Sequence, residues 1–169
     1  MGKAESAASV SVPDMAFCVA KLLEVLDETW HGAPRPGWEE GWSYYSDGHA
    51  GLEQSLDALS ADQAAQAVGN NSIAQQVQHT AIGARTFGGW VRGETPQTDW
   101  QASFVVPAPL DEAAWTALRA DLWAALGELR ADIATHAAQR QGALTSSLGA
   151  VAHLVYHLGA IRAKLKTLT

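Results

Sequence analysis

Apolar residues near the start of the chain recur every three or four positions, which is the spacing of one face of an α-helix. The repeat begins after Pro13 and Asp14, residue types that commonly open a helix, and it stops before a group of Gly and Pro residues that starts at Gly32. The positions of this face are Phe17, Val19, Leu22, Leu23, Val25, Leu26 and Trp30. The pattern predicts a first helix over about residues 14–30.

Two further segments show the same spacing. One follows a capping box formed by Ser72 and Gln75 and keeps an apolar face to about residue 91, so we expect a second helix there. The other is the longest periodic segment of the chain and predicts a third helix over about residues 111–138. Acidic residues at the start of this segment favour a helix N-terminus, where the helix dipole is positive.

The last predicted helix covers about residues 146–167, after the break expected at Gly142 and with Thr145 or Ser146 as its cap. Its apolar residues lie around most of the circumference rather than on one face. They are Leu148, Val151, Ala152, Leu154, Val155, Leu158, Ile161 and Leu165. A helix of this kind is expected to be largely buried.

Residues 31–71 form the least regular part of the sequence. Short helices are expected near residues 50–59 and 61–68, the second of them opened by a capping box of Ser60 and Gln63. A connection of this length is uncommon in a compact domain unless it has a structural or functional role. We therefore expect it to pack over one end of the molecule and to line a pocket.

Four amphipathic or apolar helices without a convincing sheet predict an all-α protein, and an antiparallel four-helix bundle is the natural packing solution. Between the second and third helices, residues 94–109 contain turn-forming residues and are expected to form a loop that crosses the bundle. Residues 13–169 are interpreted as a single domain, and the small, polar residues 1–12 as a disordered tail.

Composition narrows the possible functions. The chain of 169 residues has a formal net charge of −7, and its 11 Lys and Arg residues do not cluster, which argues against a nucleic-acid partner. Cys18 is the single cysteine, so an intrachain disulfide is impossible and a reducing compartment is favoured. Its apolar neighbours predict a buried, inert thiol. With no signal peptide or membrane span expected, the chain is interpreted as a soluble cytoplasmic protein.

Two histidines lie four residues apart in the last predicted helix. His153 and His157 therefore stand on one face, with Cβ atoms roughly 6 Å apart, at which distance two imidazoles can share one metal ion. Alternatively, the pair belongs to a narrow solvated edge of the helix, because Ser146 and Lys164 project near the same stripe. Most neighbouring residues are apolar, however, and a stripe that opens into a cleft satisfies both observations.

A catalytic metal centre characteristically has three protein ligands and an open position for water or substrate. His79, in the middle of the second predicted helix, is the best third candidate. His31 and His49 lie in the long connection, from which either can approach the site, and His136 lies at the end of the third helix. These three are interpreted as surface residues. An all-imidazole ligand set favours zinc or nickel over calcium or magnesium.

Several classes of site have no support in the sequence. A ferritin-like di-iron centre requires Glu-x-x-His on two helices, whereas the residues three positions before the three candidate histidines are Gln76, Ala150 and Leu154. The chain also lacks a Gly-rich phosphate loop, cysteine pairs and a nucleophile-elbow serine. Nucleotide, zinc-finger and α/β-hydrolase chemistry are therefore not expected.

Three segments resemble the DinB/YfiT-like metalloenzyme family, which includes thiol S-transferases and the mycothiol-dependent maleylpyruvate isomerases. Residues 72–79, Ser-Ile-Ala-Gln-Gln-Val-Gln-His, are similar to the second-helix segment that carries the first metal histidine of the family. Residues 110–115, Leu-Asp-Glu-Ala-Ala-Trp, are similar to the start of its third helix. Residues 153–162, His-Leu-Val-Tyr-His-Leu-Gly-Ala-Ile-Arg, resemble its closing His-x-x-x-His segment. The resemblance covers roughly residues 14–168.

The resemblance implies one divalent metal ion on His79, His153 and His157, and a homodimer. It further implies an S-transferase in which the metal activates a low-molecular-weight thiol for attack on an electrophile. Two alternatives remain open: a metal-dependent hydrolase that activates water, and a non-enzymatic metal-binding stress protein that keeps the same ligands. The chain departs from the family at Ala160, where many relatives carry Gln.

Overall fold

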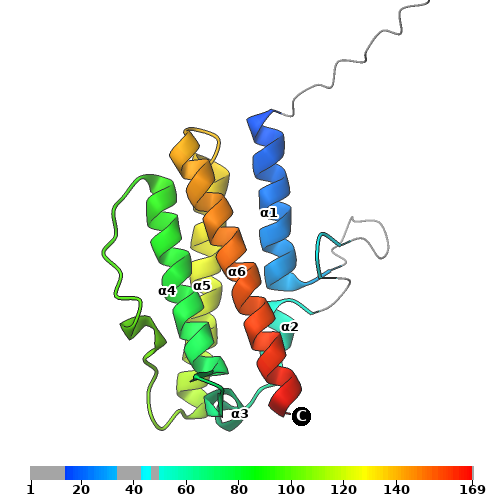
Figure 1. Ribbon diagram of the computed structural model, residues 1–169, viewed down its shortest axis with the longest axis vertical. Helices are drawn as coiled ribbons and strands as arrows, with labels where there is room; N and C mark the ends of the chain where they lie inside the picture. Colours follow the sequence, from blue (N-terminus) through cyan, green and yellow to red (C-terminus); the bar gives the residue numbers. More distant parts are fainter. Residues whose placement is uncertain (1–13, 34–42, 47–49, 169) are drawn as a thin grey trace, which may run out of the picture.

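The computed structural model describes residues 14–33, 43–46 and 50–168, and its described part is mostly helical (Figure 1). In chain order the elements are α1 (Met15–His31), α2 (Leu52–Asp57), α3 (Ala61–Ala65), β1 (Ala67–Val68), β2 (Asn71–Ser72), α4 (Ile73–Arg92), the 3₁₀ turn η1 (Ala102–Phe104), α5 (Glu112–His136) and α6 (Gln141–Leu168). The predicted all-α class is confirmed for these residues. The tail predicted over residues 1–12 and the candidate His49 lie outside them.

The starts of four helices follow the predicted capping chemistry. The side chains of Asp14, Ser60, Ser72 and Asp111 each accept a hydrogen bond from the backbone N–H three residues later. At Ser60 and Ser72, the side-chain oxygen of the glutamine three residues later also accepts a hydrogen bond from the backbone N–H of the serine, which completes both predicted capping boxes. Short-range sequence signals therefore define where these helices begin.

The last helix begins earlier than predicted, at Gln141 instead of about residue 146. Thr145 lies inside the helix, where its hydroxyl donates to the Gln141 carbonyl, as Thr and Ser hydroxyls do in helix interiors. The additional turn buries Ala143 completely. Packing of this turn outweighs the low helix propensity of Gly142, which costs about 1 kcal/mol relative to alanine in a helix interior.

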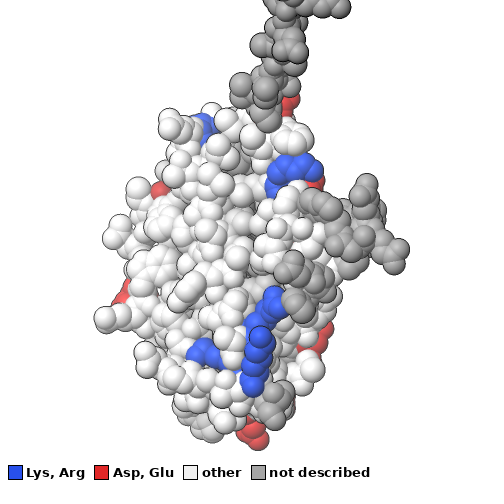
Figure 2. Space-filling model, turned by 45° about the vertical axis from the view of Figure 1, so that its right-hand side comes forward, with Lys and Arg blue, Asp and Glu red and all other residues white. Residues whose placement is uncertain are grey.

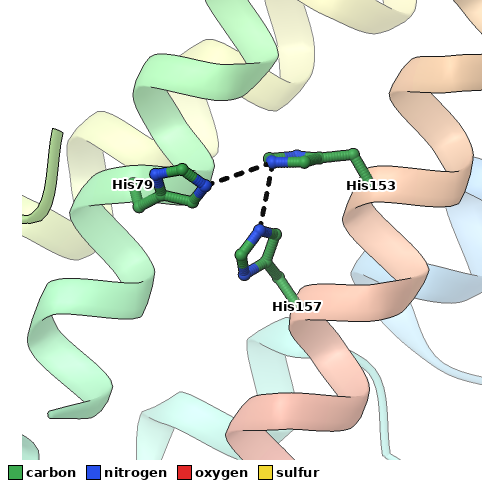
Figure 3. Close-up of side chains that lie close together, drawn as sticks. All are labelled: His79, His153 and His157. Carbon is green, nitrogen blue, oxygen red and sulfur yellow. Dashed lines mark hydrogen bonds between the residues drawn. The ribbon is translucent and has the colours of Figure 1, made fainter. Parts of the chain in front are cut away.

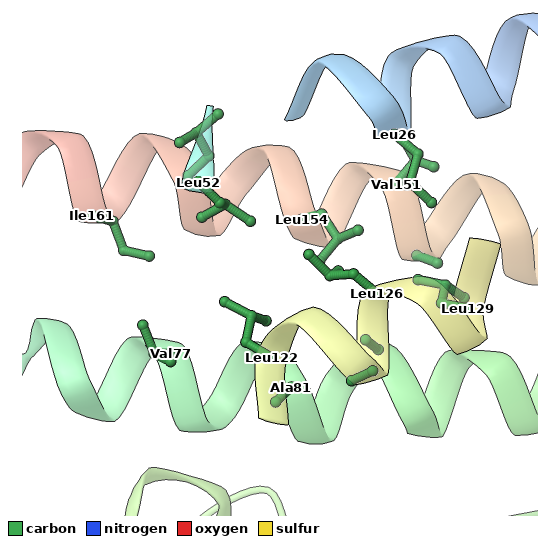
Figure 4. Packing of buried hydrophobic residues seen from close by; sticks show 14 of the residues in the cluster. Leu26, Leu52, Val77, Ala81, Leu122, Leu126, Leu129, Val151, Leu154 and Ile161 are labelled. Atoms are coloured by element: carbon green, nitrogen blue, oxygen red, sulfur yellow. The ribbon is translucent and has the colours of Figure 1, made fainter. Parts of the chain in front are cut away.

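Four long helices lie side by side, and their inner faces form the hydrophobic core (Figures 1 and 4). Each contributes side chains that are at most 1% exposed, such as Leu26 of α1, Val77 of α4, Leu126 of α5 and Leu154 of α6. α4 packs against both α5 and α6, and α1 packs against α5 and α6 from the other side. This arrangement brings α4 and α6 together along their lengths.

The described part of the connection between α1 and α4 packs at one end of the four long helices, as the sequence analysis expected. α2 packs against α1 and α6, and α3 packs against α4 and α5 (Figure 1). β1 and β2 form a small antiparallel hairpin that leads into α4. The loop after α4 runs beside that helix instead of crossing the molecule, and its turn η1 contacts α4 (Figure 1).

α6 is less buried than its composition suggested. Leu148 is 54% exposed and Tyr156 is 69% exposed, because neighbouring helices cover only part of its circumference. By length and mean hydropathy alone, α6 is the one described helix that reaches what a membrane span requires. The core helix of a soluble protein passes the same test, so this observation is weak evidence for a membrane.

The thiol of Cys18 is exposed, which corrects the prediction that it is buried. The residues of α1 that face the core are Val19, Leu22 and Leu26, at helical spacing. Cys18 is turned by about 100° from Val19 and by about 40° from Leu22, so it lies at the edge of this face and not at its centre. It lines a shallow surface groove between α1 and α6 together with Leu148.

Candidate metal centre

The three histidines predicted as ligands come together in the structure. α4 and α6 run antiparallel, so His79 in α4 faces His153 and His157 in α6, and the three imidazoles point toward one another (Figure 3). The Nε2 atom of His153 lies 3.3 Å from Nε2 of His79 and 3.0 Å from Nε2 of His157. One nitrogen from each histidine lies within 4.8 Å of the others.

The two spacings that involve His153 fit a shared metal ion. Zinc binds histidine nitrogen at roughly 2.0–2.1 Å, so two nitrogens in tetrahedral coordination are about 3.3 Å apart. The distances of 3.3 Å and 3.0 Å between the Nε2 atoms are close to this value. Without an ion, His153 can carry its proton on Nε2 and donate it to one of the neighbouring Nε2 atoms, so the same contacts are also hydrogen-bond distances. The donor set therefore suits a divalent transition metal with nitrogen preference.

Hydrogen bonds on the far side of two rings determine which nitrogen is free to bind. Ser103 donates its hydroxyl proton to the Trp100 carbonyl at 2.6 Å, so its oxygen must accept from His79 Nδ1–H, also at 2.6 Å. The side-chain NH₂ of Gln76 donates to Asn71, which leaves its carbonyl oxygen to accept from His157 Nδ1–H at 2.6 Å. Both rings then present an unprotonated Nε2, the form that a metal ion requires.

His153 is held differently. Its Nδ1 atom is buried without a hydrogen-bond partner, so the ring is oriented by packing and by the contacts of its Nε2 atom with the other two histidines. The space that the ring occupies exists because residue 83 is glycine: a Cβ atom on Gly83 would lie 2.6 Å from Cε1 of His153. On the other side the ring centroid lies 5.4 Å from that of Phe87.

Burial keeps the three imidazoles neutral. It lowers the pKa of His157 to about 3, with further lowering by the neighbouring His153 and His79. Burial likewise lowers the pKa of His153 to about 4, with a smaller contribution from His79, and it lowers the pKa of His79 from its ordinary value. Because a metal binds neutral imidazole, protons compete little with the ion near neutral pH.

Aromatic side chains surround the triad. The ring of Phe104 stacks on His79 with centroids 4.1 Å apart, and Trp100 lies 5.7 Å from the same ring and 6.3 Å from His153. The edge of Tyr156 meets His157 at 5.0 Å. No carboxylate hydrogen-bonds to the three imidazoles among the residues that the structure describes. An ion held here would keep its positive charge uncompensated.

The other described histidines lie away from the triad. His31 pairs with Glu53 at 2.8 Å and stacks on Trp30, in the connection at the end of α1. His136 lies in the last turn of α5, with Nδ1 3.4 Å from the side-chain oxygen of Gln139. Neither belongs to the metal centre, which agrees with their interpretation as residues outside the site.

Sequence reasoning missed the residues that support the ligands. Gln76 lies three residues before His79, and Gly83 lies four residues after it, so helical spacing alone places both beside the site. Ser103 lies 24 residues from its partner, and nothing in its local sequence indicates the contact. Long-range loop contacts of this kind are visible only in the folded chain.

Comparison of the chain with protein-family models, with curated proteins and with solved structures finds no match in any of the three.

Proposed function

We propose that the protein holds one divalent transition-metal ion on His79, His153 and His157 and uses it to activate a low-molecular-weight thiol for transfer to an electrophile. The observation that carries this proposal is the convergence of three Nε2 atoms, with spacings of 3.0 Å and 3.3 Å and with two of the rings held in the metal-binding tautomer. Zinc and nickel suit three imidazoles best. We therefore propose zinc or nickel as the bound ion.

Ligand number and charge favour an enzyme over a purely structural site. Structural zinc sites are closed by four protein ligands, whereas catalytic sites have three and keep one position open. A divalent ion bound here would lower the pKa of a thiol, which is about 8.5 for a free cysteine, or that of water. In the proposed reaction the thiol loses its proton, its sulfur bonds to an electrophilic carbon, and the leaving group departs with its bonding electrons.

The residues around the triad suit an apolar electrophile. Phe87 and Trp90 pack edge to face at 4.9 Å, and Trp100 lies 6.5 Å from Trp90. Trp100 is also 37% exposed, so the aromatic side chains reach from the triad to the surface. Such side chains exclude water from a reacting centre and offer apolar contact area to a substrate.

The helical arrangement supports the resemblance to the DinB/YfiT-like family. α1, α4, α5 and α6 would be its four bundle helices, with one histidine on the second and two on the fourth. On this proposal the protein is a cytoplasmic four-helix bundle that forms a dimer and whose activity depends on the metal ion. Sedimentation of the purified protein tests the dimer.

Metal content is the first test. The protein is purified without a His tag, supplemented with zinc and nickel in parallel, dialysed, and analysed by mass spectrometry. We expect close to one ion per chain, and loss of the ion in His153→Ala and His157→Ala. The matched control His136→Ala should retain it, because His136 lies outside the triad. A stoichiometry near zero, or equal losses in all three variants, contradicts the proposed site.

Turnover then separates the possible reactions. The metal-loaded protein is offered a panel of thiols with a chromogenic electrophile, and separately a panel of esters and amides without thiol. Metal-dependent reaction of the first panel supports the transferase. The uncompensated charge of a three-histidine site also favours hydroxide, so reaction of the second panel alone would identify a hydrolase. Silence in both panels favours the non-enzymatic metal-binding protein.

A further inference from the structure

A second cavity lies beside the metal centre. It has a volume of about 550 Å³ and is formed by the β1–β2 hairpin, the start of α4 and the C-terminal half of α6. This volume is in the range of cavities that bind small molecules, which is about 300–1,000 Å³. The cavity has no role in the metal site as described above.

The cavity lies next to the histidines along α6. On α6, His153, His157, Ala160 and Lys164 are spaced by four, three and four residues, so they form one stripe along the helix. The last two line the cavity, whereas none of the three histidines does. Gln76 lines it as well, and the same side chain accepts the hydrogen bond from Nδ1 of His157. Gln76 is therefore shared by the cavity wall and the support of the triad.

Lys164 is the charged side chain of this cavity. Its ammonium group donates to the main-chain carbonyl of Asn71 at 2.9 Å and to that of Val68. A lysine has three N–H donors, so one remains for a ligand. No acidic side chain pairs with Lys164 in the described part of the chain. The other polar side chains of the wall are neutral: Asn70, Asn71, Gln76, Tyr156 and Thr167.

The surface around the cavity carries positive charge, like Lys164. In Figure 2, basic side chains gather on the lower part of the face shown, the region where the C-terminal part of α6 lies in Figure 1. That part of α6 carries Arg162, Lys164 and Lys166 and contains no acidic residue. In a chain with a net charge of −7, this local positive charge favours an anionic ligand.

We infer that the cavity binds the carboxylate end of a small molecule whose other end reaches the histidine triad, with Lys164 as the anion-binding residue. The inference rests on the proposed function and specifies its substrate as a thiol that also carries a carboxylate. His157 and Lys164 are seven residues apart on α6, which corresponds to a rise of about 10 Å. Thiol and carboxylate should be separated by a similar distance.

Calorimetry with three matched compounds tests the inference. The zinc-loaded protein is titrated with ω-mercaptooctanoate, with ω-mercaptooctanol and with octanoate. The first compound has both a thiol and a carboxylate, the second has only the thiol, and the third has only the carboxylate. We expect the mercaptooctanoate to bind about tenfold more tightly than the mercaptooctanol, the effect of one charge-assisted hydrogen bond. Octanoate should bind weakly, and equally well with or without metal.

Three variants attribute the preference to the cavity. Lys164→Met should remove the preference for carboxylate without changing the affinity for mercaptooctanol. Ala160→Phe fills the cavity from α6 and should weaken octanoate binding, which tests the site without disturbing the hairpin that Lys164 holds. Lys166→Met removes the same charge from the same helix outside the cavity and should leave the preference intact.

The outcomes separate this inference from the proposed function. Equal affinities for mercaptooctanoate and mercaptooctanol in the native protein overturn the anion site and leave thiol binding untouched. A preference for the carboxylate that survives in both Lys164→Met and Ala160→Phe likewise overturns the anion site. If neither thiol binds more tightly than octanoate, the thiol proposal fails, while loss of octanoate binding in both cavity variants still supports the anion site.

Discussion

The three candidate ligands are not equivalent at the scale of single residues. Ser103 and Gln76 each fix the tautomer and orientation of one histidine, whereas His153 has no hydrogen-bond partner on its Nδ1 atom. Ordered partners of this kind raise the basicity of a ligand and hold it in position. Metal affinity should therefore depend on side chains that do not contact the ion.

Replacing Gln76 with leucine should weaken metal binding by roughly 10–100-fold, because the His157 ring loses the acceptor that fixes its tautomer. The measurement is competition for zinc with a chelator of known affinity. The control is Gln78→Leu, a substitution of the same type two residues along α4 at a half-buried position whose side chain takes part in none of the hydrogen bonds of the triad. If both variants lose the same affinity, the hydrogen bond to His157 is not what matters.

Gly83→Ala should weaken metal binding, although alanine is a better helix former than glycine. The added Cβ atom would lie 2.6 Å from Cε1 of His153, so the ring has to move and metal affinity should fall at least tenfold. Gly127→Ala in α5 is the control, since the nearest atom to its Cβ is 3.9 Å away. It should bind metal normally and gain about 0.5–1 kcal/mol of stability. Normal zinc affinity in Gly83→Ala would contradict the position assigned to the His153 ring.

At the scale of helices, one face of each long helix does most of the packing while other faces remain exposed. α5 illustrates this division. Leu122, Leu126 and Leu129 are at most 1% exposed, whereas its acidic residues Asp121 and Glu128 point outward to Arg85. Surface ion pairs of this kind contribute little, about 0–1 kcal/mol each. Helix packing therefore rests on the buried leucines.

Leu126→Ala should reduce the free energy of unfolding by roughly 2–5 kcal/mol, because it removes a completely buried side chain and leaves a cavity among the long helices. Urea denaturation followed by circular dichroism measures the loss. Leu148→Ala, at a position that is 54% exposed on α6, should cost less than about 0.5 kcal/mol. Similar losses in the two variants would mean that the assigned core is wrong.

For the molecule as a whole, the core and the metal centre are separate. Buried side chains from all four long helices form the core, while the histidines, two of them buried, lie between α4 and α6. Removal of the metal should therefore lower the melting temperature, because a bound ligand is lost, but leave the helices intact at 25 °C. Circular dichroism before and after chelation checks this. Loss of the helical signal at room temperature would mean a structural metal site.

The metal-free protein should lose stability as the pH falls from 7 to 5. Burial lowers the folded-state pKa of His157 to about 3, whereas an unfolded histidine titrates near pH 6.5, so the unfolded chain takes up the proton first. At pH 5 this costs roughly 2 kcal/mol for the one residue. The pH dependence should become shallower in His157→Gln, measured by urea denaturation at both pH values, and should be unchanged in His136→Gln. An equally steep curve in His157→Gln would contradict the assignment.

Local patterns were sufficient for much of the fold. The helical repeats predicted all four long helices, and the capping boxes at Ser60 and Ser72 located two helix starts, because capping depends on atoms only three residues apart. The acidic residues near Asp111 indicated a third start by their charge, and the structure adds a capping hydrogen bond there. The start of α6 was misplaced since burial of Ala143, a contact with other helices, decides it. The exposure of Cys18 was likewise wrong, because apolar neighbours along the chain do not show which face of α1 meets the core.

The candidate site divides in the same way. The sequence alone selected His79, His153 and His157 as candidate ligands, since a four-residue spacing places two of them on one face and both the mid-helix position of His79 and the resemblance to a known family favoured it as the third; the structure brings the three side chains together. Their convergence, the tautomers imposed by Ser103 and Gln76, and the cavity around Lys164 emerged only in the folded structure. The physical reason is distance along the chain. These contacts join residues 24 to 96 positions apart, and only the packing of α4 against α6 and of their connecting segments brings them together.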